Sequence, residues 1–265
     1  MTKQLALAVL ATWCAAASGL RAQHDECADH EDWDQDRGHY CEVREIRVAN
    51  TKSPLAVDAS PNGGVRVTGG DGDSIVVRAI VQATARSDSQ ARALVGDVRV
   101  ISTGGPIHAE GPSTHGHISW WVSFRVAVPR HTDLTLQTEN GGIQVADVEG
   151  RMRLTSENGG IVLRDVAGDV HARAENGPLH VALSGKRWSG AGLDAETVNG
   201  PVSLTIPTGY AAHLETGTVN GPTDIDIPLT LEGHIDLRHL SIDIGGGGPP
   251  IRVVTTNGPL GVHHD

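Results

Sequence analysis

Side chains of the kinds that bind metal ions are concentrated in residues 23–41. This stretch combines histidines with many carboxylates, and Asp32, Asp34 and Asp36 alternate as the first ligands of a calcium-binding loop do. Arg37, however, stands where such a loop requires glycine, and the histidines lack the ligand spacing of a zinc site. We therefore predict an acidic leader without a bound metal, and keep calcium binding by the three aspartates as the alternative.

A second set of carboxylates recurs at a constant distance. Glu139, Glu157 and Glu175 are separated from one another by 18 residues. If successive repeats stack, these carboxylates form a column of like charges, which is unfavourable unless the side chains spread into water or share a cation. Calcium suits carboxylate oxygens, but Val198 and Val219 replace glutamate in later repeats. We predict solvated side chains, with a calcium column as the alternative.

Motifs for catalysis are absent from the sequence. It contains no G-x-S-x-G, H-E-x-x-H or C-x-x-C motif, and the glycine run at 245–248 lacks the lysine of a nucleotide-binding loop. Some parallel β-helices are nevertheless polysaccharide-active enzymes, whose acidic and basic groups lie in a groove built by long loops. We predict a non-enzymatic protein without a cofactor, and keep a polysaccharide-active enzyme as the alternative.

An internal repeat indicates the elements that position these residues. An Asn-Gly pair, then Gly or Pro, then a short apolar run occurs seven times. The asparagines are Asn62, Asn140, Asn158, Asn176, Asn199, Asn220 and Asn257. Because Asn and Gly tolerate positive φ, the pair predicts a sharp turn. The residues three and five positions later are apolar in every copy except at Thr223, which predicts a short strand with one buried face.

The constant phase of these corners predicts that the copies stack. A second corner, marked by Gly150 and Gly168, lies about half a repeat away, so each repeat has two strands and two turns. Such a unit buries its apolar face only against its neighbours. We therefore predict an all-β fold, a single-stranded parallel β-solenoid (β-helix) with two strands per coil of about 18–23 residues. An antiparallel sandwich is the alternative fold.

Two details follow from the stacking. The asparagines are expected to be structural and to hydrogen-bond to one another along the axis. Arg151 and Asp169, 18 residues apart, are expected to form an exposed ion pair. The longer gap before Asn257 predicts two coils, one of which has lost its Asn-Gly pair.

The strand pattern before the regular repeats is looser. Ser87 and Gln90 form a capping box and Gly96 provides a stop, which predicts one short helix near 87–96. We therefore expect an N-terminal irregular β part at 42–130 that contains this helix, followed by regular solenoid repeats at 131–265.

The start of the chain has the features of a signal peptide. Lys3 precedes an apolar stretch, and small residues end at Ala22, so residues 1–22 are predicted to be removed on export. The mature chain is then periplasmic, on the cell surface or secreted, and no later segment is apolar enough to span a membrane. In an oxidising compartment, Cys27 and Cys41 are expected to form a disulfide that anchors the leader at 23–41.

The net charge argues against nucleic acid as a partner. The formal charge is −11 at pH 7, and removal of Lys3 and Arg21 with the signal peptide makes it more negative. An acidic surface repels the phosphate groups that dominate nucleic-acid affinity.

On these residues the chain resembles the bacterial family of adhesin-like β-strand-repeat proteins with toastrack-type domains. The resemblance rests on the Asn-Gly-Gly-Ile/Val corners, on Val128-Pro129-Arg130 and on the segment 216–221, and covers about Cys41 to Val262. It implies an exported or envelope-associated solenoid that adheres or senses, and it carries over no catalytic residue. The partner is expected to be an unidentified protein or saccharide at the cell envelope. A structural scaffold is a further alternative.

Overall fold

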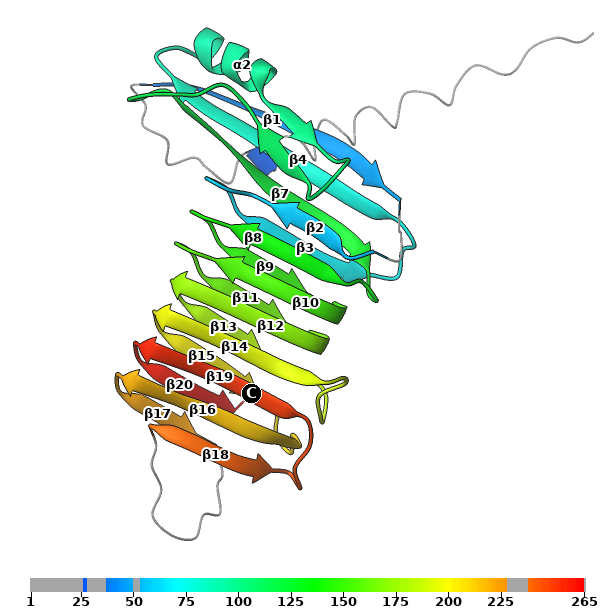
Figure 1. Ribbon diagram of the computed structural model, residues 1–265, viewed down its shortest axis with the longest axis vertical. Helices are drawn as coiled ribbons and strands as arrows, with labels where there is room; N and C mark the ends of the chain where they lie inside the picture. Colours follow the sequence, from blue (N-terminus) through cyan, green and yellow to red (C-terminus); the bar gives the residue numbers. More distant parts are fainter. Residues whose placement is uncertain (1–25, 28–36, 50–52, 228–237, 265) are drawn as a thin grey trace, which may run out of the picture.

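The protein is a stack of short strands in two facing sheets (Figure 1). The computed structural model describes residues 26–27, 37–49, 53–227 and 238–264. We call the larger sheet, with ten strands, sheet A and the eight-stranded one sheet B. The strand order in sheet A is β1 (Gly38–Val48), β4 (Ile75–Ala85), β7 (Ser119–Pro129), β3 (Val65–Gly70), β9 (Ile143–Ala146), β11 (Ile161–Arg164), β13 (Leu179–Ala182), β15 (Val202–Ile206), β20 (Leu260–His264) and β17 (Thr223–Asp226). The order in sheet B is β18 (His239–Ile244), β16 (Ala212–Asn220), β19 (Pro250–Asn257), β14 (Gly192–Asn199), β12 (Ala167–Asn176), β10 (Glu149–Ser156), β8 (Leu134–Thr138) and β2 (Leu55–Asp58). A separate antiparallel pair consists of β5 (Arg99–Ile101) and β6 (His108–Glu110).

One sheet B strand, an Asn-Gly corner and the following sheet A strand form a rung. Thus β8 and β9 make one rung, and β10 and β11 make the next. Neighbouring rungs pair in parallel and in step, so that Met152 lies between Leu134 and Val170. The predicted parallel β-solenoid with two strands per coil is confirmed.

The core lies between the sheets and is mostly aliphatic. Alternate residues point inward because the side-chain period of a strand is two. In β8, Leu134 and Leu136 are buried whereas Thr135 and Gln137 are exposed. The same alternation recurs in the neighbouring strands, so that one continuous hydrophobic core runs along the stack. Burial of this apolar surface is the main stabilising contribution.

At the N-terminal end, sheet A continues beyond sheet B. Here β7, β4 and β1 pair antiparallel to one another, and helix α2 (Asp88–Asp97) packs on β1 and β4. The helix begins as predicted, because the Ser87 hydroxyl accepts a hydrogen bond from the Gln90 amide at 3.4 Å. Gly96 lies inside the helix, which continues to Asp97, so the predicted stop is one residue early.

At the C-terminal end, the order of the rungs departs from the order of the chain. β19 lies between β14 and β16, and β20 lies between β15 and β17. The gap before Asn257 therefore does not hold two successive coils, and that prediction is wrong. It includes β18, which pairs antiparallel with β16, and the chain then returns to enter between earlier strands. Residue spacing along a chain carries no information about such a return.

Glycines stack at the second corner because the backbones of successive rungs approach closely there. Gly150 and Gly168 are register partners, and φ is +111° at Gly168 and +115° at Gly190. A Cβ atom on Gly168 would lie 2.1 Å from the carbonyl oxygen of Gly150, well inside any real contact. Gly168 therefore cannot carry a side chain without moving the backbone of the neighbouring rung.

We expect Gly168→Ala to lower the free energy of unfolding by about 3 kcal/mol or more, because a steric clash adds to backbone strain. Gly185 is the matched control: it has positive φ, +73°, but no atom lies within 4 Å of the position that a Cβ would take. Gly185→Ala should cost only about 1–2 kcal/mol. Urea denaturation measures both, and an equal loss in the two variants would contradict the close approach.

Candidate interaction surface

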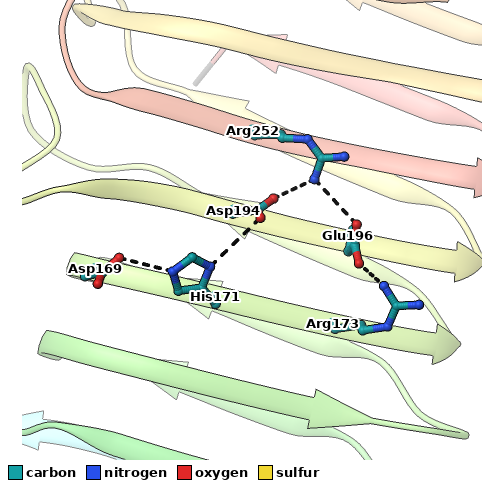
Figure 2. A network of polar contacts seen from close by, with 6 residues as sticks. All are labelled: Asp169, His171, Arg173, Asp194, Glu196 and Arg252. Carbon is teal, nitrogen blue, oxygen red and sulfur yellow. Dashed lines mark hydrogen bonds and ion pairs between the residues drawn. The ribbon is translucent and has the colours of Figure 1, made fainter.

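Outward-facing side chains of β12, β14 and β19 form a chain of ion pairs on sheet B (Figure 2). Its members are Asp169, His171, Arg173, Asp194, Glu196 and Arg252. Parallel in-step pairing brings them together, since His171 is the register partner of Asp194 and Asp194 that of Arg252. Residues distant in sequence thus become lateral neighbours on one face.

Arg252 connects two carboxylates of the neighbouring strand. Its Nη1 lies 2.6 Å from Asp194 Oδ1 and 3.5 Å from Glu196 Oε2. Glu196 is also paired with Arg173, so acid and base alternate across three strands. The Arg252 and Asp194 side chains are 38 % and 46 % exposed, and ion pairs with such exposure contribute about 0–1 kcal/mol each. The main effect of these ion pairs is that the charged side chains hold one another in fixed orientations.

His171 extends this chain toward the preceding rung. Its Nε2 lies 3.3 Å from Asp169 Oδ1, and its Nδ1 lies 3.9 Å from Asp194 Oδ2. The imidazole therefore has a carboxylate on each side.

A second histidine continues the polar surface on the last strands of sheet B. His213 Nδ1 lies 2.8 Å from Asp243 Oδ1, and His213 Nε2 lies 3.7 Å from Glu215 Oε1. Ser241 Oγ lies 3.2 Å from the same Nε2. The polar surface therefore reaches β18, the edge of the sheet. We call the outward side chains of β12, β14, β19, β16 and β18 the sheet B face.

A groove of about 260 Å³ lies on the sheet B face near the Asn-Gly corners. Arg173, Glu196 and Arg252 line it together with Val198 and Val219. Val219 is 65 % exposed, and among the described residues no other large hydrophobic side chain is exposed. The groove thus offers both charged groups and an apolar contact.

The seven corner asparagines lie above one another and form a continuous ladder. Each side-chain amide donates to the carbonyl oxygen of the preceding asparagine in the stack. The bonds are Asn140 to Asn62 at 3.3 Å, Asn158 to Asn140 at 3.0 Å, Asn176 to Asn158 at 3.1 Å, Asn199 to Asn176 at 2.9 Å, Asn257 to Asn199 at 2.8 Å and Asn220 to Asn257 at 2.8 Å. Asn257 precedes Asn220 because its rung lies between theirs.

Inside the corner, a column of buried hydroxyls accompanies the ladder. Each of these Ser and Thr residues stands two positions before a corner asparagine. Its hydroxyl donates to the backbone carbonyl oxygen of a corner glycine in the preceding rung. They are Thr138 to Gly63 at 2.6 Å, Ser156 to Gly141 at 3.0 Å, Thr197 to Gly177 at 2.8 Å, Thr255 to Gly200 at 2.9 Å and Thr218 to Gly258 at 2.9 Å. Buried carbonyl groups need such partners. This column was not predicted from the sequence, although its signal, Ser or Thr at a constant phase, is present there.

The structure does not bring Glu139, Glu157 and Glu175 together as metal ligands. Glu139 is half-buried, and its Oε1 lies 3.5 Å from the Asn140 amide nitrogen, while Glu157 and Glu175 are exposed. In the described ranges, no group of three or more His, Cys, Asp or Glu side chains is arranged to hold a metal ion. Asp32, Asp34 and Asp36 lie outside those ranges, as does the predicted signal peptide at 1–22.

Arg151 pairs with a different rung from the one expected. It is the register partner of Asp169, but its Nη2 lies 2.8 Å from Asp133 Oδ2, and its backbone amide donates to Asp133 Oδ1 at 2.8 Å. The predicted pair with Asp169 is therefore wrong. The backbone hydrogen bond and then the guanidinium lower the pKa of Asp133 below its usual value.

Two aspartates occupy the turn that follows sheet A in consecutive rungs. Asp147 and Asp165 both have positive φ, 60° and 47°. A hydrogen bond to Asp165 raises the pKa of Asp147, whereas a hydrogen bond from Ser184, at 2.5 Å, lowers the pKa of Asp165. Arg130 Nη2 lies 3.5 Å from Asp165 Oδ1. The pair shares a proton more easily than it carries two charges.

The leader is covalently joined to the sheet. Cys27 and Cys41 form a disulfide, and Cys41 lies in β1. Within the part of the chain that is described, no helix combines the length and the apolar character needed to cross a bilayer.

The in-step rungs and their polar outer face define the protein as a parallel β-solenoid with an exposed charged surface. The chain belongs to the Toastrack DUF4097 family, which it matches over residues 45–262. The resemblance expected from the corner motifs is confirmed.

Solved structures are similar at low identity. One is a candidate cell adhesion protein from Clostridium sporogenes, with a TM-score of 0.48 and 10 % identity over 85 % of this chain and 100 % of that one. Another is a candidate adhesin from Bacteroides fragilis, with a TM-score of 0.30 and 10 % identity over 84 % and 97 %. A candidate lipid binding protein from Parabacteroides distasonis has a TM-score of 0.31 and 9 % identity over 84 % and 96 %. No curated protein sequence matches the chain.

We expect Asn158→Ala to lower the free energy of unfolding by about 1–2 kcal/mol, because Asn158 both donates and accepts in the ladder. Asn62, at the ladder's end, only accepts. Asn62→Ala should therefore cost about half as much. Chemical denaturation measures both, and an equal loss at the two positions would contradict a cooperative ladder.

We expect opposite effects from two aspartate substitutions at pH 7. The raised pKa of Asp147 means that its contribution to stability is present at low pH and is lost as the pH rises through its folded-state pKa. Asn donates the same hydrogen bond at every pH and tolerates positive φ, so Asp147→Asn should stabilise by about 0.5–1 kcal/mol.

Asp133→Asn is the matched control with the opposite sign. The lowered pKa of Asp133 means that its contribution is present above the unfolded-state pKa and is lost as the pH falls. This variant should lose about 1 kcal/mol at pH 7. Both differences should shrink below the ordinary aspartate value of 3.8. Urea unfolding at pH 7 and pH 3.5 tests this, and a destabilised Asp147→Asn at pH 7 would argue against the shared proton.

Proposed function

We propose that the protein is an exported, non-enzymatic, adhesin-like interaction module that binds a protein or a saccharide at the cell envelope through its sheet B face. The observation that carries this proposal is the alternating chain of acids and bases on β12, β14 and β19. Solenoids bind partners through extended surfaces rather than through enclosed pockets.

The arrangement of this face favours recognition more than stability. Neighbouring strands hold Asp194, Glu196 and Arg252 at fixed lateral positions, so a partner meets donors and acceptors that are already oriented. A preorganised surface binds with a smaller entropic cost. Because both signs of charge are present, the face discriminates between partners by electrostatic complementarity. The groove beside Val219 adds an apolar contact.

Export is supported by two independent features. Residues 1–22 have the composition of a signal peptide, and the Cys27–Cys41 disulfide is of the kind that persists in oxidising compartments.

For the enzymatic alternative, Asp147 and Asp165 are the carboxylate pair whose pKa values are shifted in opposite directions. The side chain of Asp165 is the largest cause of the raised pKa of Asp147, so the two carboxyl groups interact. Glycoside hydrolysis requires two carboxyl groups separated by about 5–5.5 Å or by about 6.5–9.5 Å, so that a sugar or a water fits between them. Two carboxyl groups that interact this closely do not fit that geometry, whereas the alternating charges of the sheet B face fit the interaction module.

The test is binding of the purified protein to a glycan array and to extracted envelope proteins. Arg252→Ser removes the cation that connects Asp194 and Glu196, and we expect it to weaken binding at least about tenfold, as loss of a well-placed charge pair does. His180→Ala, on the exposed outer face of sheet A, is the matched control and should bind normally.

Three results would argue against the proposal. Equal affinity of Arg252→Ser and the parent protein would remove the sheet B face as the site. Turnover of an acidic polysaccharide would support the enzyme. Self-assembly into filaments without binding of any partner would support a scaffold.

A further inference from the structure

Three arginines lie in direct register on the outward face of sheet A. Arg78 of β4 is opposite Arg125 of β7, and Arg125 is opposite Arg66 of β3. Like charges that face each other across strands destabilise a sheet. The column therefore needs a counter-charge, and the chain supplies one from outside the sheet.

Glu26 of the leader is that counter-charge. Its Oε1 lies 3.3 Å from Arg78 Nη1 and 3.7 Å from Arg125 Nη1, and the residue is only 8 % exposed. A carboxylate so buried requires cationic partners. Arg78 also pairs with Glu45, with 3.4 Å between Arg78 Nε and Glu45 Oε2. Glu26 therefore shares Arg78 with a second carboxylate.

Two hollows flank Glu26 along the arginine column. One, of about 320 Å³, is lined by Glu26, Arg66 and Arg125. The other, of about 300 Å³, is lined by Glu26, Arg78 and Arg125 among others. Among the described residues, the carboxylates of Glu26 and Glu45 contact the column, and a hollow on either side of Glu26 has space for a chain bearing further acidic groups.

The disulfide holds Glu26 in this place. Cys27, the next residue, is bonded to Cys41 of β1. Cys41 is the register partner of Gln82, which is fully buried on the same face of β4 as Arg78. Within the described ranges, neither the Oε1 nor the Nε2 of Gln82 has a hydrogen-bond partner. This buried amide is thus a polar group that the described part of the sheet leaves without a partner.

We propose that Arg66, Arg78 and Arg125 form a binding site for an acidic peptide segment of a partner protein, and that Glu26 occupies it as an internal substitute while the Cys27–Cys41 disulfide is intact. The occupant indicates the ligand, because Glu26 belongs to an acidic peptide, residues 23–41. Reduction by a dithiol opens the site: the two thiols of the reductant become a disulfide, and Cys27 and Cys41 receive two electrons and two protons as thiols. This site is separate from the sheet B face and does not depend on the function proposed for it.

The probe is a fluorescein-labelled oligoglutamate, and fluorescence anisotropy measures its binding to the purified protein. We expect weak binding to the oxidised protein and at least about tenfold tighter binding after reduction with dithiothreitol. Glu26→Gln with the disulfide intact should give the same gain, which keeps the test valid if the reduced protein unfolds. High salt should weaken the complex because it screens charges.

Substitutions in the Glu26→Gln background locate the site. Arg125→Ala should lose at least about tenfold in affinity. Arg153→Ala, an exposed arginine on β10 of sheet B, is the matched control and should retain full affinity. Circular dichroism and thermal melting verify that each variant is folded.

Absence of any gain in a folded Glu26→Gln variant would overturn the proposal. An equal loss in Arg153→Ala would do the same, since it would reduce the effect to general charge. Tighter binding of oligogalacturonate than of oligoglutamate would overturn the assignment to a peptide and indicate a saccharide site. None of these outcomes affects glycan or protein binding by the sheet B face, so failure here is distinguishable from failure there.

Discussion

The structure depends on one constraint: the backbone of each rung lies directly on that of the next. At the glycine of each Asn-Gly corner this contact leaves no space for a side chain. A Cβ on Gly141 would lie 2.1 Å from the carbonyl oxygen of Gly63, and one on Gly159 would lie 2.1 Å from that of Gly141. Parallel hydrogen bonding then fixes the register, and the inward residues of successive rungs meet as one core. The same register determines which outward-facing side chains are neighbours.

Every outward position therefore becomes a column, and the chemistry of its members decides whether the column is stable. Asparagine suits a column of identical residues, because its amide both donates and accepts. Residues such as Asp194 and Arg252 suit a column in which the sign of charge alternates. The arginines of sheet A satisfy neither condition among themselves. They are partly neutralised by Glu45 of the neighbouring strand and by Glu26, which comes from outside the sheet.

The sequence predicted what repeats at constant phase. The corners, the alternation of buried and exposed residues, the parallel stacking and the capped start of the helix at Ser87 all follow from local spacing. It predicted poorly what depends on pairing between distant strands. Arg151 lies 18 residues from both Asp133 and Asp169, so spacing alone could not choose between them.

The remaining features had no periodic signal. The ion pairs of Arg252 depend on the entry of β19 beside β14, and the arginine column joins β3, β4 and β7, which have no common spacing. The raised pKa of Asp147 depends on two turns with positive φ, a conformation that aspartate adopts less readily than glycine does.

The place of β19 and β20 has a consequence for how the chain ends. In a solenoid wound in strict order, loss of the last residues only shortens the stack by one layer. Here β19 and β20 form an interior layer that is hydrogen-bonded on both sides. β16 and β17 pair with this layer and not directly with β14 and β15. Loss of residues 250–264 would separate β16 and β17 from the strands on the other side of β19 and β20. This end of the stack therefore depends on β19 and β20, although both strands come after the layer that they hold in place.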